Sequence, residues 1–345
     1  SFITSYIIIR YFLIGFKTKK ENKIDRWGIS TKSHFGGLAF TVTIIFVLLF
    51  ILIFNYAPNY YHISFGLKGL ASEYKIFIGL LFVVIFTSLS GVLDEFENLQ
   101  PITKLLLQTI TGFLLIWSGF IIPISDNFIF NYVFTILWVV FISNAINMFD
   151  NIDLALISFS FVILIILIIK LFLNDFPVAY LIVSISYLGC FLCFSIFNFY
   201  PSKLFMGDVG SFQIGAILSA LTIKVLWVDY EFESFKIGIY QLLLNNLIFL
   251  IIILDVILVF SIRVSKKRNP FKGDINHLSH KLQKIFHSPN ISAGILSFLT
   301  LLLGIAFLFL SEFSKLTFIN NFIILTVSYI LPISVLSYFV LKNID

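Results

Sequence analysis

Four segments of the sequence combine carboxylate, amide, glycine or histidine residues in patterns that could do chemistry. In the first, Asp94 and Glu95 are adjacent acids three residues after Gly91, and Lys104 follows shortly after them. Adjacent carboxylates at the end of a helix can bind Mg²⁺, directly or through its waters, or accept a proton. The alternative interpretation is a solvated loop whose acids merely cap a helix.

The second segment places four polar side chains at three-residue spacing: Asn144, Asn147, Asp150 and Asp153. On a helix this spacing predicts one polar stripe. Such a stripe at the end of a membrane helix is costly unless it faces partners or water. Its oxygens suit a hard cation and could also bind the edge of a uracil ring. A hydrogen-bonded seam between helices is the alternative.

The third segment, residues 205–211, places Asp208 between Gly207 and Gly210 just before an apolar stretch. Glycines allow the backbone to approach a ligand closely, and the N-terminus of a helix favours phosphate. Asp208 could then hold a metal ion against that phosphate. A plain glycine turn is the alternative interpretation.

The fourth segment contains Lys272, His277 and His280 after a basic run at residues 266–268. Histidines among cations can bind phosphates. A zinc site is disfavoured because no thiolate or third histidine lies nearby. A basic loop that touches lipid headgroups is the alternative. Asp255 lies inside an apolar segment, where an ionisable residue is a functional candidate.

The elements that position these segments are predicted to be membrane-spanning helices. The chain has 345 residues, of which 59% are hydrophobic and only 12% charged, with a mean hydropathy of +1.03. Soluble domains carry about 25% charged residues, so an ordinary soluble fold is excluded. A span needs about 20 apolar residues, and eleven segments are candidates: 1–16, 37–55, 74–93, 105–122, 128–148, 154–173, 178–197, 212–228, 239–262, 291–310 and 316–341. We expect a single all-α, polytopic membrane domain over residues 1–345, with about 10–11 transmembrane helices.

The distribution of lysine and arginine predicts the orientation. These residues concentrate in the loops at 17–34 and 263–288, which lie on the same side if every segment spans. Cation-rich loops are cytoplasmic, so the N-terminus is predicted to lie outside. This topology accounts for the net charge of +5 without a nucleic-acid partner. All four chemical segments then fall on the cytoplasmic side, which predicts one cytoplasmic-facing cleft.

In chain order, these segments resemble the polyprenyl-phosphate N-acetylhexosamine-1-phosphate transferase family, of glycosyltransferase family 4 type. The resemblance runs from His34-Phe35-Gly36-Gly37 through the patterns GxxD[DE], NAxNxxDxxD and FMGDxGS to PFxxDxxHxxH, over residues 30 to 285. It implies that Asp94 and Glu95 position or deprotonate the polyprenyl phosphate, with Lys104 as the following basic residue. It also implies Mg²⁺ contacts for Asn147 and Asp208, a uracil contact for Asp153, and positions near the sugar and phosphates for His277 and His280. The remaining candidates for substrate binding are Asn144, Asp150, Gly207 and Lys272.

Some residues depart from the family's pattern. Glu95 stands where the second aspartate is usual, which keeps the charge and lengthens the reach. Asn151 and Leu154 stand where the family usually has glycines, which questions the local backbone geometry and uracil binding. The segment from His277 to His280 lacks three consecutive histidines, so it is more similar to the N-acetylglucosamine-1-phosphate transferase branch than to the phospho-N-acetylmuramoyl-pentapeptide transferase branch.

The resemblance implies a Mg²⁺-dependent enzyme of a bacterial inner membrane, for which Mn²⁺ could substitute. A UDP-N-acetylhexosamine would donate its sugar-1-phosphate to undecaprenyl phosphate and release UMP, in a single displacement or through a covalent intermediate. A secondary transporter is disfavoured because the acids gather at one interface and no repeat is visible. An inactive relative that serves as a binding or scaffold protein stays open, as does assembly into a homodimer.

Overall fold

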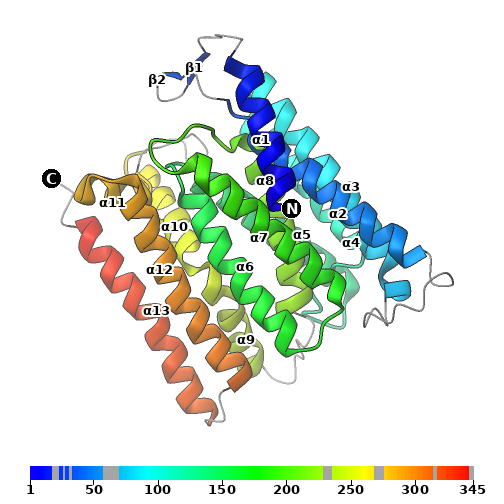
Figure 1. The fold of residues 1–345 in the computed structure, drawn as a ribbon. Helices are drawn as coiled ribbons and strands as arrows, with labels where there is room; N and C mark the ends of the chain where they lie inside the picture. Colours follow the sequence, from blue (N-terminus) through cyan, green and yellow to red (C-terminus); the bar gives the residue numbers. More distant parts are fainter. Residues whose placement is uncertain are drawn as a thin grey trace.

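The computed structural model is all-helical apart from one short hairpin (Figure 1). It describes residues 1–17, 23–25, 28–30, 33–56, 70–227, 235–267, 276–313 and 317–341. Within these ranges, eight helical segments are long and apolar enough to cross a membrane, and three shorter apolar helices accompany them. The prediction of an all-α, polytopic membrane protein is confirmed.

The elements follow one another along the chain with short connections. They are α1 (Phe2–Lys17), β1 (Lys23–Asp25), β2 (Gly28–Ser30), α2 (Gly37–Tyr56), α3 (Leu70–Glu97), α4 (Pro101–Trp117), α5 (Phe128–Phe149), α6 (Ala155–Leu173), α7 (Val178–Asn198), α8 (Gly207–Leu226), α9 (Phe235–Asn246), η1 (Leu247–Phe249), α10 (Leu250–Ser265), α11 (Leu278–Phe286), α12 (Pro289–Leu308), η2 (Phe309–Phe313) and α13 (Phe318–Leu341). The strands β1 and β2 pair antiparallel.

Helix α8 forms the centre of the bundle and is buried along most of its length. It packs against α2, α3 and α5, among others. Small residues permit this close approach, as is usual between membrane helices. A Cβ atom on Gly37 would lie 2.2 Å from the backbone nitrogen of Gly210, and one on Gly91 would lie 2.3 Å from the Cα of Val209. The N-terminal turn of α8 is therefore held firmly between α2 and α3.

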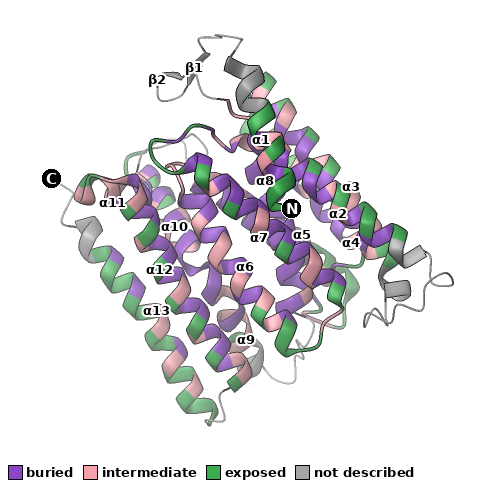
Figure 2. Ribbon diagram, in the orientation of Figure 1, coloured by how far each residue is buried: buried purple, intermediate pink, exposed green. Residues whose placement is uncertain are grey.

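The periphery of the bundle is apolar and exposed, as expected for surfaces that face lipid. Helix α13, which packs beside α12 at one edge, exposes many large hydrophobic side chains (Figures 1 and 2). In water such surfaces would be a liability for aggregation, whereas in a bilayer they need no further cover.

Several helix boundaries differ from those predicted. Helix α4 begins at Pro101, a residue that is favoured in the first turn because it has no N–H to leave unpaired. Helix α8 begins at Gly207, so Asp208 lies inside its first turn. Helix α5 ends at Phe149, and Asp150 has a non-helical ψ of 57°. The prediction of one helical stripe is therefore wrong beyond Asn147.

Candidate functional site

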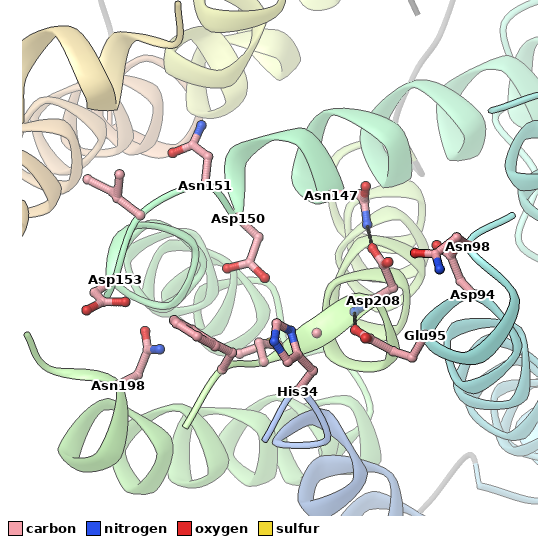
Figure 3. Close-up of a pocket in the computed structure, with 14 residues that line it drawn as sticks. His34, Asp94, Glu95, Asn98, Asn147, Asp150, Asn151, Asp153, Asn198 and Asp208 are labelled. Atoms are coloured by element: carbon pink, nitrogen blue, oxygen red, sulfur yellow. Dashed lines mark hydrogen bonds between the residues drawn. The ribbon is translucent and has the colours of Figure 1, made fainter. Parts of the chain in front are cut away.

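A polar pocket of about 290 Å³ opens at one end of the bundle, where several helices begin or end. It collects residues from the loop before α2, the end of α3, the end of α5 and the start of α8 (Figure 3). The lining residues are His34, Asp94, Glu95, Asn98, Asn147, Asp150, Asn151, Ile152, Asp153, Asn198, Phe205, Met206, Gly207 and Asp208. Three of the four segments singled out in the sequence therefore meet at one site.

One side of the pocket is built around Asp208. The Asn147 amide nitrogen donates to Asp208 Oδ1 at 2.6 Å and to Ser211 Oγ at 2.9 Å. Lys104 forms an ion pair with Asp94, and its Nζ lies 3.6 Å from Asp208 Oδ2. Lys104 thus bridges two carboxylates from different helices. Because Asp94 is only 2% exposed, this lysine supplies the positive charge that a buried carboxylate requires.

Glu95 attaches the end of α3 to the start of α8. Its Oε1 accepts a hydrogen bond from the backbone nitrogen of Asp208 at 2.9 Å (Figure 3). A carboxylate in this position satisfies one of the free N–H groups of a helix N-terminus and interacts favourably with the helix dipole. Gly207 is required beside it: its φ is +70°, and a Cβ there would lie 1.9 Å from the backbone oxygen of His34. Glu95 is therefore connected to Asp208 through the backbone N–H of Asp208.

The opposite side of the pocket carries Asp153 and Asn198, with Asp150 and His34 between the two sides (Figure 3). Asp153 Oδ2 accepts from the backbone nitrogen of Ser202 at 3.1 Å. Asp150 lines the pocket and is exposed there, and the surrounding protein reduces its contact with bulk water. Desolvation by this protein raises the pKa of Asp150 to about 7, and the charges of nearby carboxylates, Asp208 foremost, act in the same direction.

The histidine segment lies at the margin of this pocket rather than in its lining. His277 immediately precedes α11, and its ring centroid is 6.2 Å from that of His280. Ser279 Oγ donates to Oδ1 of Asn151 at 2.5 Å, which ties α11 to the pocket wall. Burial lowers the pKa of His280. Lys272 lies outside the described residues.

Asn144 is placed one turn deeper in α5 and does not line the pocket. Its amide nitrogen instead contacts Met148 Sδ at 3.5 Å. The periodicity that linked Asn144 with Asn147 is present in the helix, but of the two only Asn147 lines the pocket and donates to Asp208 and Ser211 of α8. A direct contact between Asn144 and a ligand in this pocket therefore has no support in the geometry.

Four polar lining residues were not among the sequence candidates: His34, Asn98, Asn151 and Asn198. The sequence held a signal for His34, since this residue begins the first motif of the family resemblance. In the structure its ring centroid lies 5.1 Å from that of Phe205. Asn198 bonds the backbone on both sides, accepting from Leu154 N at 2.7 Å and donating to Leu204 O at 3.0 Å. Only the three-dimensional arrangement could show that this amide, at the end of α7, holds two loops of the pocket together.

The family's second glycine position is occupied by Leu154, which adopts a left-handed backbone with φ of +69°. This conformation costs a non-glycine residue roughly 1–2 kcal/mol. We therefore expect Leu154→Gly to be more stable than Leu154→Ala by about 1 kcal/mol, because both lose the side chain but only glycine relieves the strain. Thermal unfolding in detergent measures the difference. If Leu154→Ala were instead the more stable variant, as is usual for glycine and alanine at loop positions, a left-handed backbone at residue 154 would be contradicted.

The donor chemistry of the pocket fits a hard divalent cation. Asp94, Asn147 and Asp208 bring together carboxylate and amide oxygens, which Mg²⁺ prefers. Within the described part of the chain, no three acidic, histidine or cysteine side chains form a closed metal site. Mg²⁺ is commonly held by one or two carboxylates, with waters and substrate phosphates completing its shell. Asp208 and Asn147 are the residues that would hold it.

Fold and pocket together define a polytopic membrane protein with an acidic site at one end of its helix bundle. The sequence model of Glycosyl transferase family 4 matches residues 77–226, which span α3 to α8. Among curated relatives is a phospho-N-acetylmuramoyl-pentapeptide-transferase of Streptococcus thermophilus, 30% identical over 256 residues, which are 66% of this chain and 71% of the relative. The chain belongs to glycosyl transferase family 4.

Two further relatives carry the same name. The protein of Streptococcus sanguinis is 33% identical over 181 residues, covering 47% of this chain and 54% of the relative. That of Streptococcus pneumoniae is 31% identical over 232 residues, covering 58% and 64%. The membership predicted from the ordered motifs is thus confirmed, while the predicted N-acetylglucosamine branch stays a prediction.

Proposed function

We propose that this protein transfers an N-acetylhexosamine-1-phosphate, N-acetylglucosamine-1-phosphate or a related group, from a UDP-sugar to undecaprenyl phosphate. An oxygen of the lipid phosphate attacks the β-phosphorus of the UDP-sugar, the bond from that phosphorus to the bridging oxygen breaks, and UMP leaves. The observation that carries this proposal is the arrangement of Asp94, Lys104 and Asp208. It places both signs of charge at a pocket on the end of a membrane helix bundle.

The residues of the pocket have distinct tasks in this reaction. Lys104, held between Asp94 and Asp208, offers a positive charge that can attract and orient a phosphate. The first turn of α8 adds backbone N–H groups, and Glu95 fixes its position. Asp153, on the opposite side of the pocket, would bind the uracil end of the donor. In this assignment the reacting phosphates lie at the Asp208 side of the pocket and the base at the Asp153 side.

Asp208 and Asn147 would hold Mg²⁺ beside the diphosphate. When bound, the ion offsets the negative charge of the diphosphate and of the departing UMP. The other groups act independently of it: Glu95 positions α8, and Asp94 keeps Lys104 in place.

The location of the site follows from the same proposal. Undecaprenyl phosphate needs a membrane, and UDP-sugars are cytoplasmic. Lys266 follows α10 and Lys284 belongs to α11, the helix that Ser279 ties to the pocket residue Asn151. Cation-rich loops are cytoplasmic. We therefore propose a cytoplasmic-facing site in the bacterial inner membrane, with the N-terminus outside.

The donor sugar is the point at which the sequence pattern and the relatives differ. The segment from His277 to His280 favours a simple UDP-N-acetylhexosamine, whereas the relatives are named for a phospho-N-acetylmuramoyl-pentapeptide. A UDP-linked N-acetylmuramoyl-pentapeptide is therefore the alternative donor.

The test is release of UMP by purified protein with undecaprenyl phosphate, Mg²⁺ and each of a panel of UDP-sugars. We expect turnover with a UDP-N-acetylhexosamine and at least a 10-fold lower kcat/KM with the muramoyl-pentapeptide donor, a discrimination of about 1.4 kcal/mol. Preference for the muramoyl donor would assign the protein to the other branch. No UMP from any donor, with folded protein and Mg²⁺ or Mn²⁺ present, would favour an inactive relative.

A further inference from the structure

A buried acid–histidine pair lies beside the pocket, outside its lining. Asp255, in the middle of α10, and His277, just before α11, are 1% and 5% exposed. His277 Nδ1 lies 2.7 Å from Asp255 Oδ2. The two residues are 22 positions apart in the sequence, so the contact is made by the fold and not by a local turn. An acid buried in a membrane helix is expensive and calls for a specific partner.

Both oxygens of Asp255 are engaged with the same short element. While Oδ2 faces the His277 ring, Oδ1 accepts from the backbone nitrogen of Leu278, the first residue of α11, at 2.7 Å. Asp255 therefore fixes the ring of His277 and the start of α11 together. The following residue, Ser279, bonds the pocket residue Asn151. Two adjacent contacts thus set the distance between His277 and the pocket.

We propose that Asp255 is a positioning residue for the transfer reaction and acts through His277. An ionised carboxylate can only accept hydrogen bonds, so His277 donates its Nδ1–H to Asp255. This fixes the rotation of the ring and leaves a lone pair on Nε2, which can take up a proton during the transfer and, once protonated, donate to a substrate phosphate. Asp255 itself does not touch the substrate. The inference rests on the proposed function for its kinetic consequence, but the tautomer of His277 can be measured without any turnover.

Asp255→Asn separates positioning from simple support of the fold. The Leu278 N–H still needs an acceptor, so the asparagine oxygen takes the place of Oδ1 and its NH₂ faces His277. The ring must then accept at Nδ1 and carry its hydrogen on Nε2. The shape, the helix cap and the buried volume are kept, while the tautomer is reversed. The same logic applies to the Asp-to-Asn change in the serine-protease triad, where the wrong tautomer abolishes most activity.

The experiment measures UMP release and thermal stability for Asp255→Asn, Asp255→Ala, His277→Ala and the double variant Asp255→Asn/His277→Ala. We expect Asp255→Asn to keep a Tm close to that of the wild type and to lose about 10- to 100-fold in kcat/KM, the scale for losing the group that orients a functional histidine. In the His277→Ala background, Asp255→Asn should cost nothing further. Asp255→Ala should lower the Tm as well, because the cap of α11 is lost.

Ser288→Ala is the matched control for loss of a nearby helix cap. Ser288 Oγ accepts from Ile291 N at the start of α12, at the other end of α11. This variant should lower the Tm slightly and leave kcat/KM unchanged. If Asp255→Asn turns over like the wild type, or if its loss adds fully to that of His277→Ala, Asp255 only supports the fold and the proposal is overturned.

Nitrogen-15 NMR of histidine-labelled protein in nanodiscs distinguishes failure of this inference from failure of the proposed function. The wild type should show His277 protonated at Nδ1, and Asp255→Asn should show it protonated at Nε2 only. A wild-type protein with no transferase activity but with this switch would refute the proposed function and keep the pair. An active protein without the switch would refute the pair alone.

Discussion

Asp208→Asn is expected to remove nearly all transferase activity at ordinary Mg²⁺ concentrations, by about 100- to 1,000-fold in kcat, the scale for one preorganised electrostatic group. The asparagine keeps an oxygen that can accept from the Asn147 amide nitrogen, which lies 2.6 Å from Asp208 Oδ1 in the wild type. Local packing is therefore preserved. The variant loses the negative charge that would bind a hard cation and that faces Lys104 at 3.6 Å. Part of the lost rate should return at high Mg²⁺ concentration, because the neutral amide is a weaker ligand and not an absent one.

The measurement is UMP release as a function of Mg²⁺ concentration, with the Tm in detergent as a control for folding. Asp126→Asn provides the matched charge change, because Asp126 is exposed in the connection between α4 and α5 and does not line the pocket. It should leave rate and Mg²⁺ dependence unchanged. Full activity of Asp208→Asn with an unaltered Mg²⁺ dependence would place the metal elsewhere.

The convergence of the chemical segments was predictable because topology depends on simple quantities. Apolar length gives the spans, and the positions of lysine and arginine give the sides. Asp94, Asn147 and Asp208, far apart in sequence, were thereby assigned to one face, and the structure brings all three to one pocket. The family followed from ordered motifs and needed no coordinates.

The depth of a side chain within the bundle, and the neighbouring helix that it contacts, could not be predicted in the same way. Asn144 and Asn147 have the same spacing pattern, yet only Asn147 forms hydrogen bonds to α8, because the depth of each side chain depends on how α5 packs. The pairing of Asp255 with His277 depends on where the Asp255 carboxylate of α10 lies relative to the start of α11. Such contacts arise from packing between helices, for which a single sequence carries no direct signal. Periodicity identified the polar side of a helix but not the depth at which it meets a neighbour.

Substitutions of Glu95, which stands where the family usually has aspartate, are expected to have the second large effect on activity. Glu95→Gln keeps an oxygen that can accept from the backbone nitrogen of Asp208, which lies 2.9 Å from Glu95 Oε1 in the wild type. The substitution removes only the negative charge. Glu95→Asp keeps the charge and restores the family's usual residue, but it is one methylene shorter. Helix α3 cannot simply move closer to α8, since a Cβ at Gly91, one turn earlier, would already lie 2.3 Å from Val209. The two variants therefore test charge and reach separately.

We expect charge to dominate, because a carboxylate at the first turn of α8 interacts with the helix N-terminus and with the cations of the pocket. Glu95→Gln should lose about 100-fold in kcat/KM, the lower range for a group in acid–base or electrostatic catalysis. Glu95→Asp should stay within about 10-fold of the wild type, a weakening equivalent to one lost hydrogen bond. Glu97→Gln is the matched control: it makes the same chemical change at an exposed residue two positions along α3 that does not line the pocket, and it should be silent. If Glu95→Gln is instead the more active of the two, the 2.9 Å bond that holds α8 in place matters more than the charge, and Glu95 serves as a structural anchor of the site.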